Sequence, residues 1–158
     1  DDLFVPARMN LATLLSASGR VVEAEELLRE SARIQPTWGQ VHYSLGLLLA
    51  EDENRLPEAI RSLERASWHW PENPRVTHNL AIAYWQSNRV EDAVRSFEQS
   101  IRLQPNNPEF LQRISELLAQ NDRWSDALPY LRRLVLLVPN EPRFKSFLSE
   151  AKRQLGLK

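Results

Sequence analysis

The histidines are the first residues of this chain to consider for chemistry. The stretch ASWHWP, residues 66–71, places His69 between two tryptophans, and two further histidines, His42 and His78, lie elsewhere in the chain. A helix can hold a metal ion with two histidines four residues apart, but no two of these histidines have that spacing. The chain also has no cysteine, and therefore no thiolate ligand and no disulfide. The sequence predicts neither a metal site nor a bound cofactor.

Acidic pairs are the second group of residues that could do chemistry. Glu25-Glu26 and Glu91-Asp92 both fall near the start of a predicted helix, where negative charge complements the helix dipole. The sequence contains no glycine-rich phosphate loop and no G-x-S-x-G motif. We therefore expect a protein that is not an enzyme.

Composition favours a helical domain and excludes several classes of protein. The 158 residues include only four glycines against ten prolines, with 42% hydrophobic and 26% charged residues. No apolar run reaches the roughly 18–20 residues that span a bilayer, so we expect no membrane span. The lack of cysteine favours neither the cytoplasm nor the periplasm or cell envelope.

Charge is balanced overall but uneven along the chain. The net charge is −1, which gives no general attraction to nucleic acid, although residues 128–158 hold seven basic and two acidic side chains. We interpret these basic residues as the solvated face of a last helix. The alternative is that this end binds nucleic acid or an acidic surface, which predicts strong salt dependence.

Several residue types recur with one period, which organises the chain into repeats. Prolines that end apolar stretches are spaced 35, 34 and 34 residues apart. A set of alanines, one before each of these prolines, has the same spacings. These positions are Pro36, Pro71, Pro105 and Pro139, with Ala24, Ala59, Ala93 and Ala127. A period of this length indicates an array of structural repeats.

Each repeat contains two stretches with helical spacing of apolar residues, separated by a break. In the third repeat VTHNLAIAYW and AVRSFEQSIRL flank QSNRVED, which predicts a helical hairpin. One extra residue lies between Gly46 and Ala59, and we expect it in the turn AEDENRLP.

The segments HYSLGLLL, EAIRSLERA and HNLAIAYW, followed by DAVRSFEQSIRLQP, resemble tetratricopeptide repeats. The resemblance implies an all-α fold, a right-handed superhelix of helix-turn-helix repeats at about 5–38, 39–73, 74–107 and 108–141. The fourth repeat departs from the pattern, with Ser115 at a small-residue position and Pro129 near a helix start. Residues 142–156 are predicted to form a capping helix. No polar cap precedes the first repeat, so we expect the chain to be part of a longer parent protein.

The resemblance also implies a groove on the concave surface, lined by the first helix of each repeat, that binds an extended peptide or partner segment. Apolar side chains and asparagine amides are the expected contacts. The residues assigned to it are Met9, Asn10, Tyr43, Ser44, Leu47, His78, Asn79, Ile82, Trp85 and Arg113. For Trp85 the alternative is packing between neighbouring first helices.

Some relatives bind the carboxylate tail of chaperones through a clamp of lysine, asparagine and arginine. Here only Asn79 and Arg113 match that clamp, and Glu109 stands where it needs a lysine. We therefore expect a different protein or peptide partner.

The main alternative is a structural module of a larger complex, such as an appended domain of a bacterial envelope protein. It would dock through its outer edge and first helix, and could form oligomers. A candidate second surface is an aromatic cluster of Trp38, Trp68 and Trp70 on one edge of the array. The local alternative is that these rings only cover a hairpin end.

Overall fold

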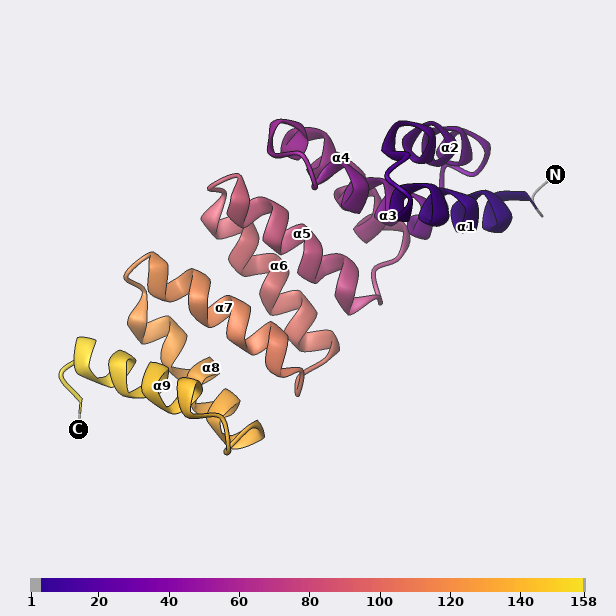
Figure 1. Ribbon diagram of the computed structural model, residues 1–158. Helices are drawn as coiled ribbons and strands as arrows, with labels where there is room; N and C mark the ends of the chain where they lie inside the picture. Colours follow the sequence, from indigo (N-terminus) through magenta and orange to yellow (C-terminus); the bar gives the residue numbers. More distant parts are fainter. Residues whose placement is uncertain (1–3, 158) are drawn as a thin grey trace.

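The structure is a computed structural model that describes residues 4–157, and within them every regular element is a helix. Figure 1 shows them in sequence from the N-terminus to the C-terminus. Their bounds are α1 Phe4–Ala17, α2 Val21–Ile34, α3 Gly39–Leu49, η1 Glu53–Arg55, α4 Leu56–His69, α5 Pro74–Gln86, α6 Val90–Leu103, α7 Pro108–Gln120, α8 Trp124–Leu137 and α9 Pro142–Gln154. The predicted all-α solenoid is confirmed.

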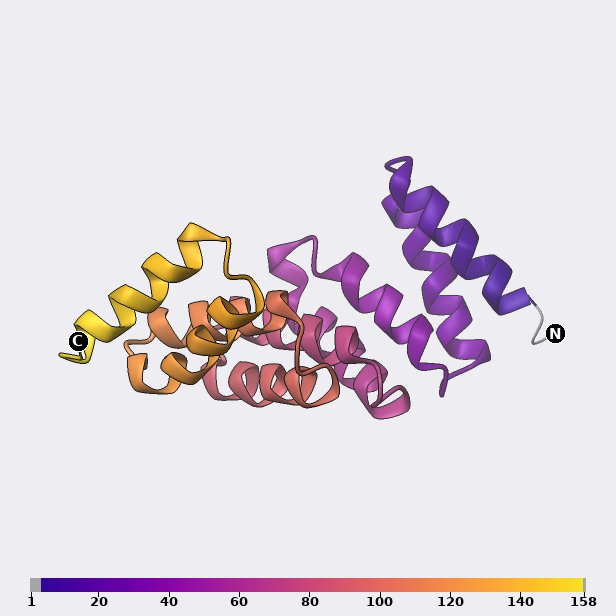
Figure 2. The same cartoon turned by 90° about the horizontal axis from the view of Figure 1, so that it is seen from below.

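Consecutive helices pack as antiparallel hairpins, α1 with α2, α3 with α4, α5 with α6 and α7 with α8. Each second helix then packs on the first helix of the next hairpin, and α9 packs on α8. The hairpins form one curved row, in which the first hairpin and α9 rise on the same side (Figure 2). The predicted capping helix is therefore in place at the C-terminal end.

Local sequence signals set the helix ends. Asn73 and Asn107 each accept a hydrogen bond from a backbone N–H of the first turn that follows, and a proline occupies the next position. Three of the turns inside hairpins use a left-handed residue, which glycine, asparagine and aspartate adopt most readily. These residues are Gly19, Asn88 and Asp122.

The second hairpin is built differently at its turn. Helix α3 ends at Leu49, and the connection to α4 contains the short 3-10 helix η1. The Asp52 side chain accepts the backbone N–H of Asn54 and fixes this turn. The extra residue inferred from the repeat spacing thus lies in a longer connection between two helices.

The hydrophobic core consists of two clusters. The N-terminal cluster joins α1 and α2 to α3 and includes Val5, Leu28 and Leu45. The C-terminal cluster runs from α4 to α9 and is centred on large side chains such as Phe97 and Leu131. The boundary between the clusters lies inside the second hairpin.

A small residue in each first helix allows the two helices of a hairpin to approach closely. In the second hairpin this residue is Gly46, where an added Cβ would lie 2.6 Å from Cγ of Leu63. The glycine is therefore required by the close approach of α3 and α4.

Candidate peptide-binding groove

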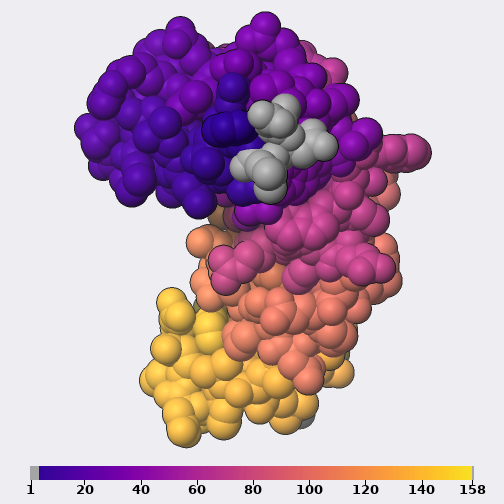
Figure 3. Space-filling view, turned by 90° about the vertical axis from the view of Figure 1, so that its right-hand side faces the viewer, coloured from indigo at the N-terminus to yellow at the C-terminus, as the bar shows by residue number. Residues whose placement is uncertain are grey.

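The concave side of the array is the face that the repeat pattern assigns to ligand binding. Figure 2 shows it as the side toward which both ends rise, and Figure 3 shows the hollow between the N-terminal and C-terminal parts. The groove positions lie on the first helices α1, α3, α5 and α7. Extended concave surfaces of this kind are the binding surfaces of repeat proteins.

A hydrogen bond between neighbouring first helices marks the middle of this surface. Nδ2 of Asn79 on α5 donates to the hydroxyl oxygen of Tyr43 on α3 at 2.6 Å. Burial raises the pKa of the Tyr43 hydroxyl, so it stays protonated at neutral pH. The pair therefore retains two donors, the tyrosine O–H and the second amide N–H of Asn79, and one acceptor, the amide oxygen of Asn79, for a ligand.

Apolar side chains border the Tyr43–Asn79 pair. Leu47 is exposed, and Ile82 and Trp85 are half-buried against the C-terminal cluster. The Trp85 ring stands edge-on to Phe97 of α6, with ring centroids 6.3 Å apart. Trp85 therefore packs partly on its own hairpin and leaves part of its ring on the surface.

A cavity of about 350 Å³ lies on the surface between α1 and α3. Its walls include Thr13 and Ser16 from α1 and Ser44 and Leu47 from α3. Asn10 of α1, which stands at the same repeat position as Ser44 and Asn79, is exposed. The N-terminal half of the groove therefore contains a depression lined mainly by small and apolar side chains.

The cation at the C-terminal end of the groove is already paired. Arg113 contacts Glu116 at 3.1 Å, and the Gln112 amide donates to the same carboxylate at 2.7 Å. This arrangement leaves little net positive charge at the C-terminal end of the groove.

The structure corrects the assignment of Met9 and His78 to an open groove. Met9 is 7% exposed and belongs to the N-terminal cluster, and His78 is 4% exposed. The His78 ring stacks on Phe110 at 4.4 Å and meets Phe97 edge-on. Both side chains therefore pack between helices and do not point into the concavity.

Burial changes the chemistry of His78. Neither ring nitrogen has a hydrogen-bond partner within the described residues, and the Glu109 carboxylate lies 3.8 Å away. Desolvation lowers the pKa of His78 to about 4, with the Glu109 charge opposing this shift. The ring is therefore neutral at physiological pH.

The structure does not bring the three tryptophans of the candidate second surface into one cluster. Trp38 packs on the N-terminal cluster, and Trp70 lies against Gly39 and edge-on to Tyr43, at 6.3 Å between ring centroids. Trp68 is 82% exposed, and within the described chain its ring pairs with no other. Trp68 and Trp70 are two residues apart and face different sides, and Trp68 is much the more open ring, since Trp70 is 36% exposed.

A repeated ion pair at the start of each second helix has a clear signal in the sequence. An arginine precedes each second helix, and an acid three residues later pairs with it. The pairs are Arg20–Glu23, Arg55–Glu58, Arg89–Asp92 and Arg123–Asp126. Their spacings of 35, 34 and 34 equal those of the alanine column. Arg55 and Arg123 also reach the previous hairpin, at Glu25 and Glu91, and so link neighbouring repeats.

The described residues contain neither a metal site nor a membrane-spanning helix. Residues 4–157 bring together no group of histidine, aspartate and glutamate side chains suited to a metal ion. In the same part of the chain, no helix combines the length and apolar character needed to cross a bilayer.

Family models match most of the chain. A tetratricopeptide repeat model matches residues 43–108 and 78–142, and a second model of the same description matches residues 5–30. No curated protein matches the sequence significantly.

Solved structures show the same architecture. A crystal structure of the MamA protein superimposes with a TM-score of 0.86 at 14% identity, covering 97% of this chain and 83% of that one. A MamA mutant gives a TM-score of 0.72 at 26% identity, with coverage of 84% and 77%. A tetratricopeptide repeat protein from Parabacteroides merdae gives a TM-score of 0.85 at 19% identity, with coverage of 96% and 60%.

Proposed function

This chain belongs to the tetratricopeptide repeat family, whose members are typically non-catalytic scaffolds for protein interactions, and we propose that it binds an extended peptide segment in its concave groove. The observation that supports this proposal is the Tyr43–Asn79 pair, with Leu47, Ile82 and Trp85 beside it. An O–H donor and an amide acceptor next to apolar side chains suit a peptide backbone with apolar anchors.

The polar part of this site can be removed without changing its shape. Peptides selected from a random dodecapeptide library on the unmodified protein serve as the probe, and calorimetry gives their affinities. Tyr43→Phe keeps the ring and removes the hydroxyl, so we expect binding to weaken by about fivefold. Asn79→Ala combined with Trp85→Ala should weaken it by more than about tenfold, because a partly exposed ring is lost as well.

Trp68→Ala is the matched control, since it removes an exposed ring outside the groove. Circular dichroism of every variant separates loss of binding from loss of fold. Full affinity in the Asn79→Ala/Trp85→Ala variant would contradict the groove proposal.

A second candidate function is permanent assembly through the first helix. Leu11 and Leu14 of α1 are 48% and 67% exposed, whereas the equivalent positions of α3, α5 and α7 are buried. This apolar face continues the interface by which each later first helix packs on a preceding second helix. A stable oligomer in dilute solution that becomes monomeric in Leu11→Glu/Leu14→Glu would favour assembly, whereas a monomer that binds peptides would favour the groove.

A further inference from the structure

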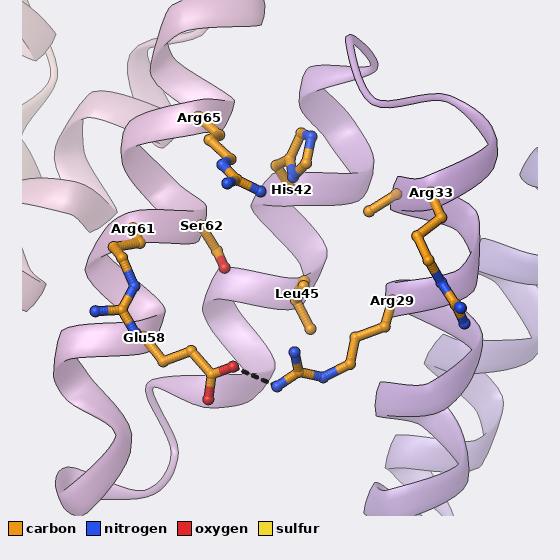
Figure 4. A pocket seen from close by; sticks show the side chains of 9 residues that line it. Arg29, Arg33, His42, Leu45, Glu58, Arg61, Ser62 and Arg65 are labelled. Carbon is orange, nitrogen blue, oxygen red and sulfur yellow. Dashed lines mark hydrogen bonds and ion pairs between the residues drawn. The ribbon is translucent and has the colours of Figure 1, made fainter.

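An arginine-lined cleft lies on the opposite side of the array from the groove. It is formed by α2 and α4 over a floor from α3, and its volume is about 400 Å³ (Figure 4). That volume is within the range of about 300–1,000 Å³ that is usual for small-ligand sites. The second helices form its walls, so this cleft is separate from the proposed peptide groove. Its residues are Arg29, Ala32, Arg33, His42, Leu45, Glu58, Arg61, Ser62 and Arg65.

The charge of the cleft is unbalanced. Glu58 pairs with Arg29 across the cleft and with Arg55 at 2.8 Å, and Arg55 and Arg29 also bind Glu25. These two acids and two arginines neutralise one another. Figure 4 shows the Arg29–Glu58 pair spanning from one wall to the other.

Three guanidinium groups of the cleft take no part in this network of salt bridges. Arg33 on α2 and Arg61 and Arg65 on α4 form no ion pair with any residue between 4 and 157. His42 is neutral, because burial lowers its pKa. Its Nε2–H donates a hydrogen bond to the carbonyl oxygen of Pro36, 2.7 Å away. The cleft thus carries an excess of about three positive charges, which favours a ligand group with more than one negative charge.

The hydroxyl of Ser62 also points into this cleft. The residue as a whole is only 8% exposed, and its Oγ reaches the cleft and forms no hydrogen bond within the described chain. Other buried serines, namely Ser31, Ser100 and Ser115, donate at 2.7 Å to a carbonyl of their own helix. Figure 4 shows the Ser62 hydroxyl directed into the space beside the Arg29–Glu58 pair. It is an available donor in the wall of a cationic cavity.

We call the contact region between successive second helices a junction, so that α2 and α4 form the first and α4 and α6 the second. The second junction lacks this arrangement of arginines. The positions of Arg29, Arg33 and Arg65 correspond there to Glu64, Trp68 and Gln99. Arg95, which corresponds to Arg61, is paired with Asp92. At the third junction Arg102 and Arg133 stand at the positions of Arg33 and Arg65, but Pro129 stands at that of Arg61. Among the described helices, only the first junction therefore has all three free arginines.

We propose that the cleft between α2 and α4 binds a phosphate group. Arginine binds phosphate oxygens through paired N–H donors, and the Ser62 hydroxyl adds a donor from the wall. Leu45 and Ala32 supply an apolar lining that strengthens these contacts. The group can belong to a free anion or to a phosphorylated segment of a partner, and the experiment separates these two sources.

Calorimetry of the whole chain tests this proposal with inorganic pyrophosphate, a phosphoserine peptide and the same peptide without phosphate. Arg61→Gln/Arg65→Gln should weaken binding of the phosphate-bearing probes by more than about tenfold, and Ser62→Ala by about threefold. The unphosphorylated peptide should not compete for the cleft. Tighter binding of pyrophosphate identifies a free anion as the ligand, and tighter binding of the phosphopeptide identifies a modified partner.

The matched control removes two exposed arginines from the equivalent face of α6, as Arg95→Gln/Arg102→Gln. This control should change affinity by less than about twofold, because screened surface charges act weakly at a distance. The proposal is overturned if the control weakens binding as much as the cleft variant does, which would indicate general attraction to a basic surface. It is also overturned if the unmodified protein binds neither phosphate-bearing probe.

Discussion

The two hydrophobic clusters differ in how their outer ends are closed. The C-terminal cluster continues into α9, which places Phe144 and Ala151 in the core and turns Lys145 and Arg153 to solvent. The N-terminal cluster ends at α1, where Leu11 and Leu14 remain exposed. Within the described residues, α9 presents a polar outer face and α1 presents an apolar one.

This difference indicates that stability is uneven along the array. Each repeat of such a protein is stabilised by its own packing and by contact with its neighbours. Within residues 4–157 the first hairpin packs on one other hairpin and presents exposed apolar side chains on its other face, so we expect it to open at a lower free energy than α5–α9. Three predictions test this comparison.

The largest effect is expected for Phe97→Ala. Phe97 is fully buried and contacts His78 and Trp85, so the cavity should cost about 3–5 kcal/mol of the free energy of unfolding. Urea unfolding followed by circular dichroism gives the loss. Hydrogen exchange should rise throughout α5–α9.

Leu28→Ala is the matched variant at the same repeat position in the N-terminal cluster. It should cost about 2–4 kcal/mol locally and raise exchange mainly in α1–α3. Equal effects of both variants on every helix would show that the array unfolds as one unit.

A smaller effect is expected for acid acting on His78. Its pKa is about 4 in the folded chain, below the ordinary value of 6.5, so between these values the unfolded chain binds more protons. Above pH 6.5 the protonation of His78 therefore does not lower the free energy of unfolding. As the pH falls toward 4 the free energy of unfolding decreases, by about 2 kcal/mol at pH 5. Urea unfolding at neutral pH and near pH 5 measures this dependence.

His78→Leu should flatten the dependence, because it removes the titrating ring from the C-terminal cluster. His42, whose pKa is also lowered by burial, provides the remaining slope. An unchanged slope in His78→Leu would place the acid sensitivity elsewhere.

The smallest effect is expected on the open face of α1. Leu14→Gln should change the free energy of unfolding by less than about 0.5 kcal/mol, because this side chain is in water. The same substitution at Leu117, a fully buried residue at the equivalent position of α7, should cost more than about 2 kcal/mol. Thermal unfolding of the two variants, at several protein concentrations, makes the comparison. A large loss in Leu14→Gln would mean that α1 is covered in solution.

Much of the fold could be predicted from the sequence because its signals are local. The proline and alanine columns mark each hairpin, and the one unequal spacing points to the connection that contains η1. Trp124, at the start of α8, packs on the C-terminal cluster and meets Phe147 edge-on. Periodicity was sufficient here, because a helix needs only contacts within a few residues and a repeat needs only its neighbours.

The candidate sites depended on contacts that periodicity does not specify. Tyr43 and Met9 occupy the same column of the repeat, yet Tyr43 bonds Asn79 across two helices whereas Met9 is buried. Likewise Trp68 and Trp70 are two residues apart, and only Trp70 has a ring partner.

The sequence by itself thus determined the repeat, the hairpins and the small residue at which each pair of helices meets. Tertiary structure decided which side chains of one column reach the surface, and it brought Arg33 of α2 to the same cleft as Arg61, Ser62 and Arg65 of α4. The physical reason is the rotation between successive hairpins. A small change in that angle moves a side chain from the core to the groove, and the angle is set by packing between residues about 35 positions apart.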